Sequence, residues 1–189
     1  RTAVITGAGG GIGKAIALEL AANGVHCNVL DRASDLVDAT VAQISQSGGK
    51  ATGHICDVTD EAGIKSVANS ITSCDVLVNA AGLVRPGALA DLTTSEWDDL
   101  LKVNLTGYFL MAREFTPHLV ASGNGSMIHI ASISSTNPQG SSGAYSVSKA
   151  GVVIMSKQLA FELGAKGVRS NTVSPGLVRT PMTEAYYQV

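Results

Sequence analysis

The sequence has few aromatic residues and no long apolar segment. Phe, Trp and Tyr together make up 4% of the chain, which argues against an aromatic-rich recognition module. No apolar run approaches the roughly 20 residues that a membrane-spanning helix needs, and no charged segment followed by an apolar one opens the chain. We therefore expect a soluble protein without a membrane partner.

Clusters of like charge are also missing. The chain has 13 basic and 15 acidic residues, a formal net charge of −2, and no stripe of Lys or Arg. Such a stripe is what neutralises a phosphate backbone. Nucleic acid is therefore not an expected partner.

Cysteine is scarce, and its spacing does not indicate a metal site. Cys27, Cys56 and Cys74 form an odd, scattered set without the spacing of metal ligands. We expect buried, reduced thiols and no bound metal. This pattern favours the reducing cytoplasm.

Glycine is plentiful, and apolar segments alternate between strand-like and helix-like patterns. The hydrophobic content of 45% is enough for one substantial core. Strands are predicted at residues 3–5, 25–30, 51–56, 75–78, 127–131 and 170–173, and helices at residues 12–20, 36–44, 61–71, 95–120 and 145–163. Polar or glycine-rich turns follow the strands, so the sequence predicts a single α/β domain: a Rossmann-like, doubly wound parallel sheet with helices on both faces.

A glycine-rich loop, TGAGGGIG at residues 6–13, follows the first predicted strand. Gly7, Gly11 and Gly13 leave room for backbone N–H groups and a positive helix end to approach a pyrophosphate. The alternative is a tight strand-to-helix turn that binds no ligand. Asp31 ends the second strand and favours a dinucleotide site, because its carboxylate can accept hydrogen bonds from adenosine ribose hydroxyls.

The residues near the predicted adenosine bear on the choice of cofactor. Asp31 would repel a 2′-phosphate and favours NAD, whereas the neighbouring Arg32 keeps NADP as the less favoured alternative because a guanidinium binds phosphate. Asp57 and Val58, after the third strand, are placed to bracket an adenine ring. Asp57 is equally suited to be the N-cap of the next helix.

A phenol, an ammonium and a hydroxyl form a second candidate cluster. Tyr145 and Lys149 lie four residues apart in a predicted helix and so share one face. Hydride transfer at a carbinol carbon also requires a proton to leave or join the oxygen. Tyr145 would be that acid or base, Lys149 and an oxidised nicotinamide would stabilise the phenolate, and Ser132 would hold the substrate oxygen.

These motifs in combination resemble the short-chain dehydrogenase/reductase family, from the first strand to about Thr180. The family's glycine pattern matches residues 6–13, its adenine-proximal Asp matches Asp57, and its Asn-Asn-Ala-Gly turn matches residues 79–82 with Ala80 in place of the second Asn. The family's catalytic tetrad falls on Asn104, Ser132, Tyr145 and Lys149.

The resemblance implies roles for these residues. Asn104 would lie at a distortion of the long helix and hold a water that connects Lys149 to solvent, and Lys149 would also bind the nicotinamide ribose. The backbone of Val178 and the hydroxyl of Thr180 would meet the carboxamide. The complete set of cofactor-binding residues expected is Gly7, Gly11, Ile12, Gly13, Asp31, Arg32, Asp57, Val58, Asn79, Ala80, Gly82, Tyr145, Lys149, Pro175, Gly176, Val178 and Thr180.

The expected activity is that of an NAD-dependent oxidoreductase acting on a secondary alcohol or ketone of unspecified identity. The alternatives are an NADPH-dependent ketoreductase of the 3-oxoacyl-acyl-carrier-protein type and an inactive nucleotide-binding sensor or subunit. By resemblance, a homodimer or homotetramer would form on the helices at 95–120 and 145–163. Family members usually continue past Val189, so residues 1–189 are expected to be one domain lacking its C-terminal part.

Overall fold

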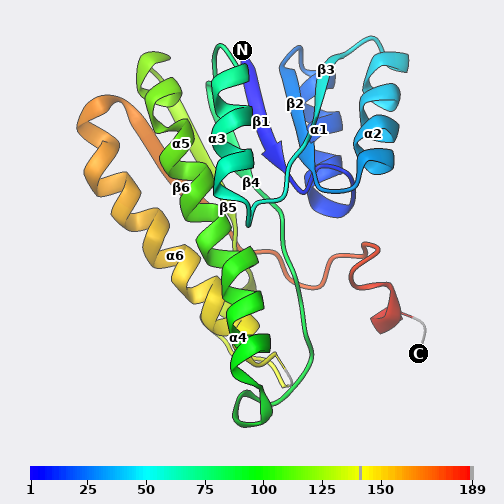
Figure 1. The fold of residues 1–189 in the computed structure, drawn as a ribbon, viewed down its shortest axis with the longest axis vertical. Helices are drawn as coiled ribbons and strands as arrows, with labels where there is room; N and C mark the ends of the chain where they lie inside the picture. Colours follow the sequence, from blue (N-terminus) through cyan, green and yellow to red (C-terminus); the bar gives the residue numbers. More distant parts are fainter. Residues whose placement is uncertain (141, 188–189) are drawn as a thin grey trace.

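The computed structural model describes residues 1–140 and 142–187, which form one six-stranded sheet (Figure 1). The strands are β1 (Thr2–Thr6), β2 (His26–Asp31), β3 (Lys50–Ile55), β4 (Val76–Asn79), β5 (Gly125–Ile130) and β6 (Val168–Val173). Their order is β3-β2-β1-β4-β5-β6, and every pairing between neighbours is parallel. The predicted Rossmann-like sheet is confirmed.

The helices connect successive strands and cover both faces of the sheet. They are α1 (Gly11–Ala22), α2 (Ser34–Gln46), α3 (Glu61–Ser70), α4 (Thr94–Leu101), α5 (Gly107–Ala121) and α6 (Ala144–Leu163). Short 3-10 segments occur at Leu89–Asp91, Ile133–Ser135, Gly164–Lys166 and Glu184–Tyr187. The long helix expected over 95–120 is divided into α4 and α5 by a π-helical turn, Lys102–Thr106, which produces the distortion that the family resemblance implied.

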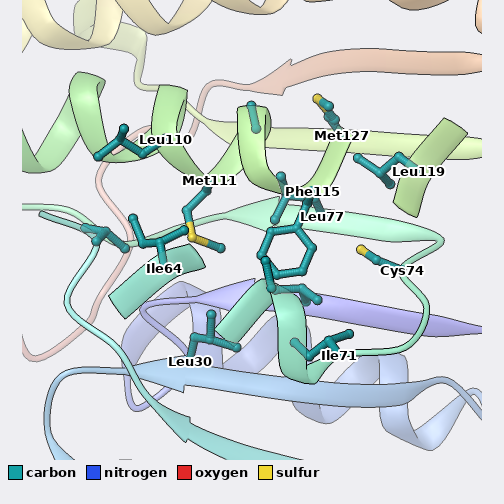
Figure 2. Close-up of a cluster of buried hydrophobic side chains, with 14 of the residues drawn as sticks. Leu30, Ile64, Ile71, Cys74, Leu77, Leu110, Met111, Phe115, Leu119 and Met127 are labelled. Atoms are coloured by element: carbon teal, nitrogen blue, oxygen red, sulfur yellow. The ribbon is translucent and has the colours of Figure 1, made fainter. Parts of the chain in front are cut away.

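Alternate residues of the central strands face opposite layers of the core. Val4 and Leu77 point toward the layer of α3, α5 and α6, where Phe115 and Met111 fill the space against the sheet (Figure 2). Ile5 points toward the opposite layer and packs against α1 and α2. This period-two alternation buries both faces of the strands, as a parallel sheet requires.

Of the two roles left open for Asp57, the N-cap of α3 is excluded by the structure. Asp60, not Asp57, is the N-cap residue, and its Oδ1 accepts a hydrogen bond from the N–H of Ala62 at 3.1 Å. The Asp57 carboxylate instead accepts hydrogen bonds from the N–H and hydroxyl of Thr59, both at 2.8 Å. Asp57 is thereby available at the edge of the sheet.

The structure places the three cysteines and bears on the absence of long apolar segments. Cys27, Cys56 and Cys74 are free thiols in the interior, as expected. Across residues 1–140 and 142–187, each helix is too short or too polar to cross a membrane.

Candidate functional site

A cavity of about 410 Å³ runs along the carboxyl ends of the strands. The chain after β6 crosses beneath these strand ends and closes one side of it (Figure 1). The cavity is lined by nearly all of the predicted cofactor residues: Gly7, Gly11, Ile12, Gly13, Asp31, Arg32, Asp57, Val58, Ala80, Gly82, Tyr145, Lys149, Pro175, Gly176, Val178 and Thr180. Ser132 also lines it, so one continuous space joins the glycine-rich loop to the candidate catalytic residues.

The glycine-rich loop has the tight geometry that its sequence predicts. Gly7 has a φ of 63°, and a Cβ there would lie 2.7 Å from the Cα of Ala81. A Cβ at Gly13 would overlap the carbonyl oxygen of Gly7. Residues of the first turn of α1 line the cavity and none of them is acidic, so no side chain of that turn opposes the positive helix end, which fits the pyrophosphate of a dinucleotide.

Asp31 and Asp57 lie along the next part of the cavity. Asp31 accepts hydrogen bonds from the N–H of Gly9 at 3.1 Å and of Ala33 at 3.2 Å, which fix its carboxylate beside the loop. Burial acts to raise the pKa of Asp57, but the hydrogen bonds from Thr59 and the Arg32 charge leave that pKa below its ordinary value. Both carboxylates are suited to accept hydrogen bonds from an adenosine.

Residues 79–82, at the end of β4, differ in whether they line the cavity. Ala80 and Gly82 line the cavity, and the Thr6 hydroxyl accepts hydrogen bonds from the N–H groups of Ala80 and Ala81 at 3.0 and 3.2 Å. Asn79 is buried and its side chain points away from the cavity, donating to the carbonyl of Tyr108 at 3.3 Å. The Asn79 side chain therefore holds β4 to α5, and only its neighbours line the predicted cofactor site.

Asn104 joins the π-helical turn to two other elements. Its Oδ1 accepts from the N–H of Leu83 at 2.7 Å, while its Nδ2 donates to the Leu83 carbonyl at 2.8 Å and the Ser148 hydroxyl at 3.1 Å. Ser148 in turn donates to the carbonyl of Tyr145 at 2.7 Å. Asn104 does not line the cavity, but it fixes the loop after β4 against the start of α6.

Ser132 and Tyr145 line the part of the cavity formed at the end of β5 and the start of α6. Ser132 follows β5 in an extended conformation, and its Oγ accepts the N–H of Ser134 at 3.1 Å. Burial raises the pKa of the Tyr145 phenol, and the Ser132 hydroxyl opposes this shift. The protein by itself therefore holds Tyr145 in its protonated form near neutral pH.

Lys149 is almost wholly buried, with 3% of its surface exposed. Its Nζ lies 5.7 Å from the centre of the Tyr145 ring, as the predicted shared helix face requires. The ammonium donates to the carbonyl of Ile130 at 2.7 Å and to the Tyr108 hydroxyl at 3.2 Å. Burial lowers its pKa to about 7.

The partners that hold Lys149 and Asn104 were not predicted from the sequence. Ile130 acts through its backbone carbonyl, and Leu83 through both of its backbone polar groups, so neither side chain carries a signal. Tyr108 had one: it lies four residues after Asn104, one helical turn away, and is the only aromatic residue that contacts the Lys149 ammonium from α5 within the described part of the chain.

The chain is similar to many proteins of one family. A family model described as short chain dehydrogenase matches residues 1–188. A D-threitol dehydrogenase of Mycolicibacterium smegmatis is 37% identical over 186 residues, covering 96% of this chain and 72% of that protein. A 3-oxoacyl-acyl-carrier-protein reductase of Thermotoga maritima is 35% identical over 188 residues, covering 97% of this chain and 76% of that protein.

Two solved structures agree with the sequence relatives. An actinorhodin polyketide ketoreductase variant with NADPH superposes with a TM-score of 0.94 at 33% identity, covering 100% of this chain and 76% of the other. A metagenomic short-chain oxidoreductase in complex with NADP gives a TM-score of 0.89 at 36% identity, covering 95% and 83%. The sheet, the glycine-rich loop and these matches lead to one conclusion: the chain is an oxidoreductase that belongs to the short-chain dehydrogenase/reductase family.

Proposed function

We propose that this oxidoreductase moves a hydride between NAD(H) and a secondary alcohol or its ketone, with Tyr145 as general acid and base. The observation that carries the proposal is that one cavity is lined both by the glycine-rich loop and by Tyr145, Ser132 and Lys149. A dinucleotide laid along Asp31 and the loop would end beside the phenol. The names of two relatives, a dehydrogenase and a reductase, support alcohol and ketone chemistry.

The nicotinamide cofactor supplies or accepts the hydride, and the chain handles the proton. In oxidation Tyr145 takes the proton of the alcohol, and in reduction it returns the proton to the ketone oxygen. The Ser132 hydroxyl holds that oxygen within reach of the phenol. Because burial raises the pKa of Tyr145, phenolate formation depends on nearby positive charge, and the Lys149 ammonium is that charge within the chain.

We assign Lys149 a second contact, with the nicotinamide ribose, and Asn104 a place in the proton path between Lys149 and solvent. Both polar atoms of the Asn104 side chain, Oδ1 and Nδ2, are occupied by hydrogen bonds with Leu83 and Ser148. Asn104 therefore contributes to this path by fixing the loop after β4 against the start of α6.

The Asp31 carboxylate supports NAD as the cofactor. It is fixed beside the loop by the N–H groups of Gly9 and Ala33, where a 2′-phosphate would meet a like charge. A specific observation favours the second candidate, an NADPH-dependent ketoreductase: two similar structures are described with NADPH or NADP, and Arg32 lines the same cavity.

Steady-state kinetics with each cofactor separates the two candidates. A panel of secondary alcohols and ketones, followed by absorbance of the reduced cofactor, should give a higher kcat/KM with NAD(H) than with NADP(H). Asp31→Ser should raise the relative kcat/KM for NADP(H) by about tenfold or more by removing the repulsion, while Asp35→Ser, a nearby exposed carboxylate on α2, should not. A parent enzyme that prefers NADP(H) would establish the ketoreductase alternative.

The surface of α6 supports a homo-oligomer. Val147, Ile154 and Phe161 are spaced by seven residues and are 41, 64 and 85% exposed, so they form an apolar stripe along one side of the helix. We propose that this stripe and α5 form the contact between copies.

We also propose that residues 1–189 act as one cofactor-binding and catalytic domain. Its three buried free thiols support a location in the reducing cytoplasm.

A further inference from the structure

Tyr108 is a buried aromatic residue of α5 that the sequence did not assign to the site. None of its surface is exposed. Its hydroxyl donates to the carbonyl of Ile130 at 3.2 Å, and its ring stacks on His129 at a centroid distance of 6.1 Å. These contacts fix both the ring and the hydroxyl of Tyr108 between α5 and β5.

The Lys149 ammonium rests on this fixed phenol. Its Nζ donates to the Tyr108 hydroxyl at 3.2 Å and lies 4.9 Å from the centre of the Tyr108 ring. It also donates to the Ile130 carbonyl at 2.7 Å. The ammonium is thus held between the rings of Tyr108 on α5 and Tyr145 on its own helix.

No carboxylate balances this cation within residues 1–140 and 142–187, since the ion pairs there involve only arginines as the cations. The titratable groups that face it are Tyr108, Tyr145 and, from β5, His129. Burial raises the pKa of Tyr108 and lowers that of His129 to about 4, so both are neutral near pH 7. The charge is therefore stabilised by dipoles and ring faces alone, and each of them matters more than in water.

We propose that Tyr108 is a positioning residue for the reaction: its hydroxyl and ring hold the Lys149 ammonium 5.7 Å from the centre of the Tyr145 ring, where its charge favours the phenolate. This role rests on the function proposed above, because it acts through the same lysine. It is distinct from the role of Asn104, which bonds Leu83 and Ser148 rather than Lys149.

Tyr108→Phe tests the proposal because it keeps the ring and its volume and removes the hydroxyl. The first readout is the titration of Lys149 in the cofactor-free protein, followed by NMR of ¹³C-labelled lysine and assigned with Lys149→Met. Loss of an acceptor disfavours the ammonium, so Lys149 should titrate at lower pH in Tyr108→Phe. Ser156→Ala is the matched control, since it removes a buried hydroxyl of α6 that bonds Ser170 and not the lysine.

The second readout is the pH profile of alcohol oxidation. With a less charged lysine, the acidic limb should move to higher pH in Tyr108→Phe, and kcat at neutral pH should fall about fivefold, the effect of one hydrogen bond. Ser156→Ala should leave both unchanged. A Lys149 titration identical in Tyr108→Phe and the parent would overturn the proposal, whatever happens to stability. A shifted titration in a protein without any turnover would support the positioning role and refute the proposed function.

Discussion

The ammonium nitrogen of Lys149 lies 5.7 Å from the centre of the Tyr145 ring, one turn away on α6. At this range a cation stabilises a phenolate more than a phenol. Burial shifts the two pKa values in opposite directions: it raises the pKa of Tyr145 and lowers the pKa of Lys149 to about 7. The buried Tyr145 phenol favours its neutral form, and the buried Lys149 ammonium loses its proton readily. Such a pair is suited to proton transfer.

The glycine-rich loop gives a matched pair of substitutions. Gly13→Ala should reduce the free energy of unfolding by more than about 2 kcal/mol, because its Cβ would overlap the Gly7 carbonyl and the backbone would have to move. Gly10→Ala should cost less than about 1 kcal/mol, because a Cβ there meets no atom within 4 Å and the residue is extended. Urea unfolding compares the two, and equal losses would contradict the described packing of the loop.

Acidification should destabilise the protein through His129. Burial and the Lys149 charge lower its pKa from an ordinary value of 6.5 to about 4. Between these values the unfolded chain binds a proton that the folded chain does not, so this contribution to stability is present above pH 6.5 and is lost toward pH 4. The shift corresponds to about 3 kcal/mol.

The variant His129→Gln isolates that contribution. Its free energy of unfolding, measured by urea between pH 4 and 8, should depend less steeply on pH than that of the parent from pH 6.5 to 4. The same slope in both proteins would show that other groups cause the acid sensitivity.

The apolar stripe of α6 should be required for assembly. Phe161→Glu places a charge on the most exposed residue of the stripe, which is 85% exposed, and burying an unpaired charge in an interface is unfavourable. Light scattering should report a dimer or tetramer for the parent and a smaller species for Phe161→Glu. Gln46→Glu, on α2, should behave like the parent. A monomeric parent would refute the proposed contact.

The sequence was a good guide wherever local periodicity determines the outcome. The i,i+4 spacing of Tyr145 and Lys149 and the turn after Thr6 follow from the conformation of a few adjacent residues, and the structure has both. Residue type alone does not determine the N-cap of α3, because Asp57 and Asp60 are both suitable residues and the backbone conformation selects Asp60.

Contacts between distant elements could not be predicted in the same way. Tyr108 and Lys149 are 41 residues apart, and their hydrogen bond depends on how α5 and α6 pack against β5. The Asn79 side chain belongs to a turn motif by sequence, yet it turns into the core because Tyr108 and His129 offer it partners there. The direction of a side chain at a strand end depends on the elements packed against it. The spacing of residues in the sequence does not show which elements these are.

Tyr145 is the residue proposed to transfer the proton, and Tyr145→Phe tests this role most directly. Turnover with the best substrate of the alcohol and ketone panel should fall by about 10³-fold or more, while the dissociation constant for NAD, measured by titration calorimetry, should stay within about threefold of the parent because the ring remains. Turnover close to that of the parent in Tyr145→Phe, with cofactor binding intact, would contradict the account.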